Sequence, residues 1–264
     1  MFEAIAEFRQ KLNAGEICLG AGITLADSSV VEAIAPLVDF FWIDLEHTHL
    51  SYETVQAHLI AARAGGVAAL VRVRGSDIPH LKPVLDIGAS GVIVPQVRSA
   101  DEVRQVVSAC RYPPLGTRGY GPRRAADYGR RGGAAWMQQV NDQVFLGVQI
   151  ENLDALAEVD EIARIERLDS IVLGPYDLSI ALGYAGQLDH PEVLSAIRRI
   201  IAAARAGRKY VGTGMAANPD DARAAIALGV QWIQCGDDYT YMIARANELM
   251  QEIRGAGGIS QQQP

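Results

Sequence analysis

The chain has 264 residues, of which 49% are hydrophobic and 21% are charged, and its formal net charge at pH 7 is −7. A chain of this length and composition can bury the core of one large α/β domain. The negative net charge argues against a nucleic-acid or anionic-membrane partner, because binding to phosphate groups depends on clustered positive charge.

The first segment, residues 1–15, reads as an amphipathic helix, because its charges are spread throughout and a signal peptide has an uncharged core. No apolar run in the sequence is long enough to cross a bilayer. The cysteines Cys18, Cys110 and Cys235 lie far apart, which favours reduced thiols over a disulfide framework or a zinc site. Together these features predict a cytoplasmic protein.

Strand-like and helix-like segments then alternate regularly. Each strand-like segment is short and mostly apolar, and a helical pattern follows it, as expected of parallel strands covered on their outer side. Eight such units in about 250 residues predict a single (β/α)₈ TIM-barrel domain spanning residues 1–255, with a flexible tail over residues 256–264. The expected strands are residues 16–24, 40–47, 68–75, 91–97, 144–151, 170–177, 210–217 and 231–236.

A doubly wound open sheet is the alternative fold. Sheets of that kind usually carry a glycine-rich nucleotide-binding turn after the first strand. The corresponding stretch here, "LGAGIT", does not match the G-x-G-x-x-G pattern, so neither this fold nor a dinucleotide site is expected.

Residues 112–143 form a long irregular segment that interrupts the alternation. The segment is rich in arginine, but the acidic chain as a whole argues against nucleic acid. A long loop in a compact domain is usually functional, so we expect either a lid over the active site or a contact with another subunit. Its arginines are Arg118, Arg123, Arg124, Arg130 and Arg131.

Polar side chains gather at the expected C-terminal ends of four strands, where barrels of this kind hold their active sites. Charges with a purely structural role would have no reason to prefer one end. The residues are Asp44, Glu46 and His47 after the second strand, Arg72 and Arg74 in the third, Gln149 and Glu151 in the fifth, and Asp177 after the sixth.

Each of these residues has two interpretations. Glu151 and Asp177 are hard oxygen ligands of the kind that Mg²⁺ or Mn²⁺ takes, but each could instead cap the helix that follows it. Arg72 inside a barrel needs a partner, either a carboxylate such as Asp44 or an anionic substrate. His47 is either an acid or base that works near neutral pH or a structural residue.

Three further features bear on catalysis. Asp86 could hold the imidazole of His47 in one tautomer, although no spacing in the sequence requires that contact. The pair Asp237 and Asp238 looks like a surface or capping pair, but its place after the eighth strand keeps a functional role open. Neither Lys82 nor Lys209 ends a strand, so no Schiff-base lysine is expected.

Five stretches, "WIDLEHTHLSYE", "LDIGASGVIVPQVRSADE", "RYPPLGTRGYG", "VQIEN" and "LGPYDLSIALGYAGQLDHPEV", occur in this order along the chain. Together they resemble the HpcH/HpaI family of metal-dependent class II pyruvate aldolases. The resemblance implies Mg²⁺, Mn²⁺ or Co²⁺ as cofactor, and a homo-hexamer built as a trimer of dimers with its C-terminal helix swapped between subunits. Carried over position by position, the family's metal ligands fall on Glu151 and Asp177, its catalytic histidine on His47, its orienting aspartate on Asp86, its enolate-stabilising arginine on Arg72, and its substrate contacts on Gln149, Gly174 and Pro175.

The activity implied by the resemblance is reversible cleavage of a 4-hydroxy-2-oxo acid to pyruvate and an aldehyde through a metal-bound enolate, in aromatic-compound or sugar-acid catabolism. The stretches "EHTHL" and "GYGPRRAADYGRRGG" differ from the better-known members, so the aldehyde is left open. Three alternatives remain: a 2-oxo-acid decarboxylase, a CoA-thioester lyase of the citrate-lyase type, and a catalytically silent barrel that serves as a binding module.

Overall fold

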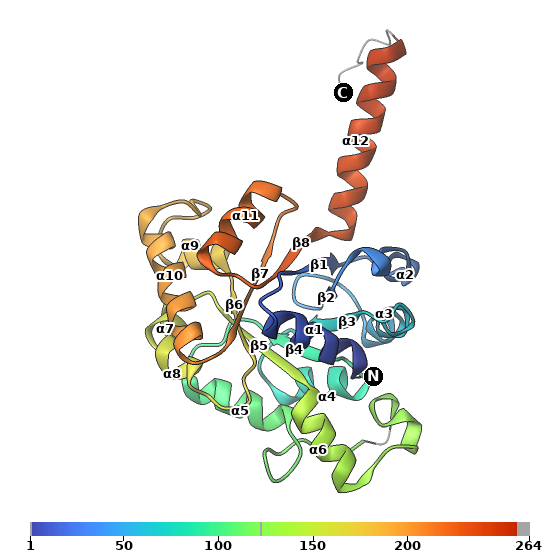
Figure 1. Cartoon of the computed structure of the whole chain (residues 1–264), viewed down its shortest axis with the longest axis vertical. Coiled ribbons are helices and arrows are strands. Elements are labelled where there is room, and N and C mark those ends of the chain that lie inside the picture. Colours follow the sequence, from blue (N-terminus) through green and yellow to red (C-terminus); the bar gives the residue numbers. More distant parts are fainter. Residues whose placement is uncertain (1, 122, 258–264) are drawn as a thin grey trace.

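Eight parallel strands close into a barrel in the computed structural model, which describes residues 2–121 and 123–257 (Figure 1). Neighbouring strands pair in chain order, and β8 closes the barrel against β1. The (β/α)₈ fold expected from the sequence is therefore confirmed. The strands are β1 Cys18–Ile23, β2 Phe40–Asp44, β3 Ala68–Arg72, β4 Gly91–Val94, β5 Phe145–Ile150, β6 Ser170–Leu173, β7 Tyr210–Met215 and β8 Trp232–Asp237.

Helices cover the outside of the barrel. Several begin with a side-chain cap: the Oγ of Ser51, for example, accepts a hydrogen bond of 3.1 Å from the backbone N–H of Thr54. Among the described residues, no helix is both long and apolar enough to cross a membrane. The α-helices are α1 Glu3–Asn13, α2 Ser29–Ile34, α3 Tyr52–Ala64, α4 Ile78–Asp86, α5 Ala100–Cys110, α6 Gly133–Gln143, α7 Leu153–Ala157, α8 Val159–Ala163, α9 Pro175–Ala181, α10 Pro191–Ala206, α11 Pro219–Leu228 and α12 Asp238–Gly257.

Aromatic side chains fill the amino-terminal half of the barrel interior. Phe8 of α1 packs against Phe40, Phe145 and Trp232, with ring centroids 5.3, 5.5 and 6.2 Å apart. The indole of Trp232 fits because β7 carries Gly212 beside it, where a Cβ would lie 1.9 Å from the ring. The indole N–H of Trp232 donates a hydrogen bond of 3.0 Å to the Oγ of the buried Ser170 at the start of β6, so this end of the barrel interior is closed and its polar atoms are paired.

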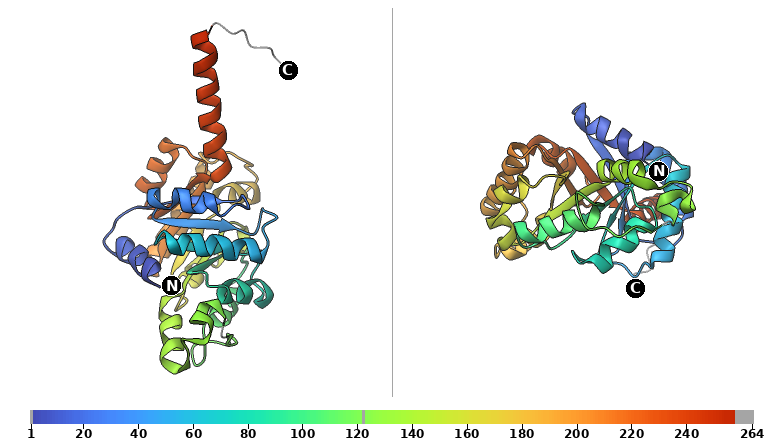
Figure 2. Two further views of the ribbon diagram at one scale, coloured as in Figure 1. Left: turned by 90° about the vertical axis from the view of Figure 1, so that its right-hand side faces the viewer. Right: turned by 90° about the horizontal axis from the view of Figure 1, so that it is seen from below.

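The arginine-rich insert lies at the amino-terminal end of the barrel, because it connects α5 to the start of β5 (Figure 2). Arg124 donates hydrogen bonds to the backbone carbonyls of Ile87 (2.8 Å) and Leu59 (3.1 Å). The expectation of a lid over the active site of the same barrel is therefore wrong. The expectation that residues 112–143 are irregular also fails in part, since α6 occupies the last third of them.

The last helix, α12, leaves the carboxyl-terminal end of the barrel and projects away from it (Figures 1 and 2). The tail predicted for residues 256–264 lies outside the described residues from position 258 onward. Because α12 projects, it does not lie along the outer face of β1, where Leu19 remains 45% exposed.

Candidate active site

Arg72 organises the carboxyl ends of β2 and β3. Asp44 and Arg72 are cross-strand partners in the register of the two strands. The guanidinium donates two hydrogen bonds of 2.8 Å, from Nε to Oδ1 and from Nη2 to Oδ2 of Asp44. It also lies 5.4 Å from the ring centroid of Trp42. The carboxylate partner expected for this cation is present, and the bidentate contact fixes the plane of the guanidinium.

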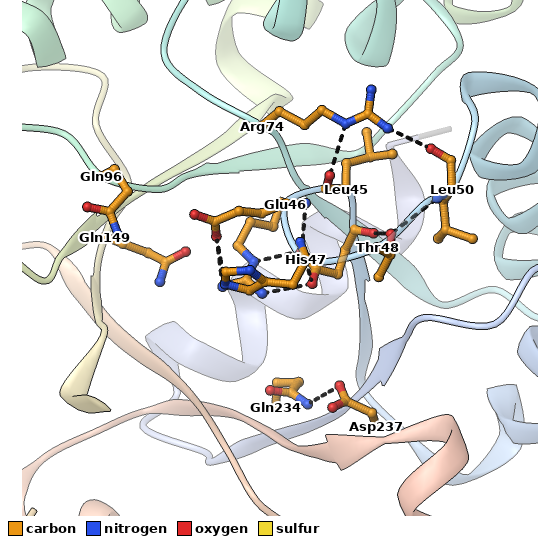
Figure 3. Close-up of polar contacts among 12 residues, drawn as sticks. Leu45, Glu46, His47, Thr48, Leu50, Arg74, Gln96, Gln149, Gln234 and Asp237 are labelled. Atoms are coloured by element: carbon orange, nitrogen blue, oxygen red, sulfur yellow. Dashed lines mark hydrogen bonds and ion pairs between the residues drawn. The ribbon is translucent and has the colours of Figure 1, made fainter. Parts of the chain in front are cut away.

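The loop after β2 places Glu46 and His47 beside this pair, and a dashed line in Figure 3 joins the side chains of Glu46 and His47. The Asp44 carboxylate accepts hydrogen bonds from the backbone N–H groups of Glu46 (3.0 Å) and His47 (3.3 Å), so the chain turns at the strand end. Glu46 Oε2 lies 3.1 Å from Arg72 Nη1 and 3.6 Å from His47 Nε2. The His47 side chain is 66% exposed, so its imidazole is accessible to a substrate.

Glu151 follows β5 and is 2% exposed. Its Oε1 accepts a hydrogen bond of 2.7 Å from the backbone N–H of Gln96, and its Oε2 accepts one of 2.8 Å from Gln149 Nε2. Gln149 and Glu151 thus meet on one face of the chain, as the alternation predicts. Gly174 makes room for the carboxylate, because a Cβ there would lie 2.3 Å from Glu151 Oε2.

Carboxylates crowd this end of the barrel. Burial raises the pKa of Glu151 to about 7, the Gln96 hydrogen bond opposes that rise, and the negative charges of Glu46 and Asp177 add to it. Burial likewise raises the pKa of Glu46, against the lowering effect of Arg72. Such a cluster favours a bound cation, since positive charge offsets the repulsion among the carboxylates.

The oxygen atoms of Glu151, Asp177 and Gln149 are ligands of the kind that a hard divalent cation prefers. The Oε1 of Gln149 is buried and accepts no hydrogen bond within the described part of the chain. Residues 2–121 and 123–257 contain no group of three or more His, Cys, Asp or Glu side chains arranged to hold a metal. Two carboxylates, with water and substrate completing the ligands, match Mg²⁺ and similar ions, which retain several waters in proteins.

Comparisons with known proteins show to which family the chain is similar. Residues 26–244 match the family model described as HpcH/HpaI aldolase/citrate lyase. The chain belongs to this family. A curated relative, the 2-keto-3-deoxy-L-rhamnonate aldolase of Escherichia coli O157:H7, is 38% identical over 234 residues, which cover 88% of this chain and 86% of the relative.

Two solved structures of the HpcH/HpaI family superpose closely on the chain. The aldolase from Desulfitobacterium hafniense DCB-2 has a TM-score of 0.86 and 32% identity, covering 93% of this chain and 96% of that one. The aldolase/citrate lyase family protein from Burkholderia cenocepacia J2315 has a TM-score of 0.88 and 30% identity, covering 94% and 99%. The family expected from the sequence motifs is confirmed, and with it the assignment to the aldolase class of lyases.

Asp86 occupies a different place from the rest of the predicted HpcH/HpaI site. It is the last residue of α4, a helix that runs back to the amino-terminal end of the barrel, and its Oδ1 accepts a hydrogen bond of 3.0 Å from Arg118 Nη2. In the described residues of this chain it has no contact with His47. An orienting role for Asp86 within one chain is therefore not supported, and the carboxylate next to His47 is Glu46.

The remaining predicted residues lie at or beside the barrel mouth. Gly174 connects β6 to α9, Pro175 is the first residue of α9, and Asp177 is in its first turn, half-buried. Arg74 has a bracing role instead. Its Nε and Nη2 donate hydrogen bonds to the carbonyls of Leu45 (3.1 Å) and Leu50 (2.9 Å), and so hold the loop that carries His47 (Figure 3).

Sequence reasoning missed Gln96, which follows β4. Its backbone has a φ of 55°, and this conformation presents the N–H to Glu151. A backbone donor is independent of residue type, so the sequence contains no side-chain signal for it. Its position near the end of the expected strand "GVIVPQV", residues 91–97, was the available clue.

Proposed function

We propose that the chain is a divalent-metal-dependent aldolase that reversibly cleaves a 4-hydroxy-2-oxo acid of sugar-acid catabolism to pyruvate and a hydroxylated aldehyde. The observation that carries the proposal is the pairing of Arg72 with Asp44 and Glu46 close to the buried Glu151. This arrangement combines a fixed cation for a developing oxyanion with carboxylates suited to a metal. The name of the curated rhamnonate-aldolase relative supports the substrate class.

Glu151 and Asp177 would hold the cation, which we take to be Mg²⁺, Mn²⁺ or Co²⁺. When bound, the cation supplies Lewis-acid stabilisation to the carboxylate and 2-keto oxygens of the substrate. Gln149 supports this role because its Nε2 donates a hydrogen bond to Oε2 of Glu151 and so fixes that oxygen. The buried Oε1 of Gln149 has no hydrogen-bond donor among the described residues, and it could serve the cation site as a further oxygen ligand or acceptor. Gly174 and Pro175 bring the backbone between β6 and α9 next to the substrate carboxylate.

The residues of the chain account for the proton and charge movements of cleavage. His47 takes the proton of the 4-hydroxyl, directly or through water, as the C3–C4 bond breaks and the aldehyde leaves. The bonding electrons pass to the pyruvate enolate, and Arg72 stabilises the negative charge on the 2-oxygen. Protonation of C3 completes pyruvate. Asp44 keeps the guanidinium rigid throughout, so little reorganisation is needed when the charge develops.

Metal-dependent aldol product is the expected result when the protein is incubated with pyruvate, an aldehyde panel and Mg²⁺ or Mn²⁺. We expect EDTA to remove the activity and added metal to restore it. His47→Ala should lower turnover by about 10²- to 10⁴-fold, the usual contribution of a general base. His80→Ala, at a histidine of α4, is the control and should retain wild-type turnover. Product formation, measured by chromatography, decides the outcome.

Other outcomes of the same assay separate the alternatives. Exchange of pyruvate methyl protons with D₂O but no aldol product would leave enolate formation intact and identify the acceptor as the missing part. Release of CO₂ from oxaloacetate without aldol product would favour the decarboxylase, and a strict need for a CoA ester would favour the thioester lyase. The proposed function fails if wild-type protein shows neither exchange nor product with metal present.

We further propose that the chain assembles as a hexamer, a trimer of dimers, through exchange of α12. This projecting helix carries an exposed apolar stripe formed by Tyr239, Met242, Ile243, Met250 and Ile253, all between 42% and 56% exposed. An apolar stripe on a helix that leaves its own barrel requires a partner surface. The exposed Leu19 on the outer face of β1 marks the uncovered part of a neighbouring barrel that such a helix would cover. Buried free thiols at Cys18 and Cys110 suit the cytoplasmic location that belongs to the same proposal.

Sedimentation velocity tests the assembly. The full chain should sediment with a mass six times that of one chain, and the double variant Met242→Glu, Ile243→Glu should dissociate into smaller species because it places charges in the apolar stripe. Glu248→Gln, on the same helix at an exposed ion pair, is the matched control and should remain hexameric. A monomeric wild type would contradict the proposal.

A further inference from the structure

A carboxylate faces the barrel mouth from β8, where the usual alternation of a strand would not place it. Trp232 and Gln234 face the interior, so strict alternation would turn residue 236 inward and Asp237 outward. The pairing of β8 with β1 shifts register at this point, and Asp237 becomes the partner of Gly22. Gly236, with a φ of 78°, is where the chain departs from regular strand geometry. The irregularity therefore turns Asp237 inward, which is how bulges near active sites re-aim side chains.

Glycines on the neighbouring strands leave the space that this carboxylate and Gln234 occupy. At Gly22 of β1, a Cβ would lie 2.0 Å from Asp237 Oδ1 and 2.6 Å from Gln234 Nε2. At Gly214 of β7, a Cβ would lie 2.7 Å from Gln234 Oε1. The pair is thus built into a recess between β7 and β1, on the β8 side of the barrel in Figure 3.

The adjacent Asp238 has a different, structural role. It is 1% exposed, and its carboxylate accepts hydrogen bonds from the backbone N–H groups of Thr24 (3.0 Å) and Leu25 (2.9 Å) and from the Thr24 hydroxyl (2.6 Å). All of these bonds tie the start of α12 to the loop after β1. The two adjacent aspartates therefore have different roles: Asp238 stabilises the fold, and Asp237 faces the mouth of the barrel.

The hydrogen bonds of the inward pair leave acceptors unused. Gln234 Nε2 donates to the carbonyl of Gly236 (2.6 Å) and to Asp237 Oδ1 (3.1 Å), which uses both amide hydrogens and fixes the amide orientation. No donor to Gln234 Oε1 or Asp237 Oδ2 is found in residues 2–121 and 123–257. Because these two free atoms are hydrogen-bond acceptors, they can bind ligand groups that donate a hydrogen bond, such as hydroxyl groups.

Charge limits the ligand further. Within the described residues Asp237 forms no salt bridge, and Arg72 is already held by Asp44 and Glu46. Burial, Asp238 and Asp44 raise the pKa of Asp237 while Arg72 lowers it, which places the carboxyl within electrostatic reach of the catalytic groups. A second anionic group beside this half-buried carboxylate would be repelled, whereas a neutral hydroxylated group would not.

We propose that Gln234 and Asp237 form the specificity wall for the aldehyde half of the substrate, which accepts neutral hydroxylated aldehydes by hydrogen bonds from their hydroxyl groups and disfavours anionic semialdehydes. The proposal rests on the proposed aldolase function, since it assigns the acceptor part of that same site. It also gives the mouth two chemically distinct sides: a metal and oxyanion side at β2, β3 and β5, and a hydroxyl-binding side at β8.

The test compares two aldehydes that differ by one hydroxyl group, 2-hydroxypropanal and propanal, together with succinate semialdehyde as the anionic probe. For wild type we expect kcat/KM with pyruvate to be at least about tenfold higher for 2-hydroxypropanal than for propanal, because a site that binds a hydroxyl discriminates against its absence. In Asp237→Ala this ratio should fall to within about threefold, mainly through KM, and the relative rate with succinate semialdehyde should rise. Asp237→Asn should fall between the two.

Asp221→Asn, an exposed substitution on α11, is the control and should retain the wild-type ratio. Far-UV circular dichroism and thermal melting identify any variant that fails to fold, and Gln234→Leu provides a second, independent removal of an acceptor. An unchanged aldehyde ratio in folded Asp237→Ala and Gln234→Leu would overturn the specificity wall while leaving the aldolase intact. Failure of the aldolase itself would instead appear in wild type, as an absence of metal-dependent proton exchange from pyruvate.

Discussion

Replacing Glu151 by Gln is expected to lower kcat for aldol cleavage by about 10³-fold, which corresponds to the several kcal/mol that a Lewis-acid metal supplies. The amide keeps the size of the side chain but loses the charge that a divalent cation requires. Glu151 is 2% exposed and accepts a hydrogen bond on each oxygen, so the position of its carboxylate is fixed. Mn²⁺ affinity, measured by isothermal titration calorimetry, should fall in parallel with kcat.

A second ligand variant and a control variant accompany this experiment. Asp177→Asn should also weaken Mn²⁺ binding, since it removes the second proposed ligand. Asp154→Asn, at an exposed carboxylate in the first turn of α7, should bind Mn²⁺ as wild type does. Undiminished Mn²⁺ affinity in Glu151→Gln would show that the metal is held elsewhere and would remove the central carboxylate from the proposal.

Arg72→Ala is the second substitution with a large expected effect. Loss of one preorganised oxyanion donor should lower kcat by about 10²- to 10³-fold. Stability should also fall, by about 3–5 kcal/mol in the free energy of unfolding, because Asp44 is 5% exposed and would be left as an unpaired buried carboxylate. Urea denaturation and steady-state kinetics measure the two effects separately.

Arg72→Lys separates charge from geometry. A lysine retains the positive charge but cannot make the two parallel bonds to Asp44, so we expect stability to recover more fully than kcat. Arg223→Ala, at an exposed ion pair on α11, is the control for both readouts. A variant Arg72→Ala with near-wild-type kcat would exclude Arg72 from transition-state stabilisation.

The fold was predictable because hydrophobic alternation and cap residues act locally. Ser51 caps α3 through its side chain, and the eight strands fall within the predicted ranges apart from small differences at their ends. The core of the site was predictable for a topological reason: the carboxyl ends of parallel strands meet at one end of a barrel, so Asp44, Arg72 and Glu151 had to approach one another.

Positions that depend on more than strand order were not predictable from the sequence. Asp86 was associated with His47 by family resemblance, but a helix that follows a strand ends at the opposite end of the barrel, where Arg118 binds it. The inward turn of Asp237 depends on the register shift beside Gly22, and a period-2 pattern cannot reveal a shift. The helix α6 was missed because glycine and arginine dominate the residues before it.

The aromatic packing around Phe8 has a consequence for how long a substrate can be. The rings of Phe40, Phe145 and Trp232 close the barrel from below, so a bound molecule cannot extend toward the amino-terminal end. Every atom added to the aldehyde must extend outward, past the loop of His47 and the β8 side of the mouth. The length of aldehyde that the enzyme accepts is therefore set by the loop of His47 and by the β8 side of the mouth. Redesign for bulkier aldehydes should alter these parts and leave the interior rings unchanged.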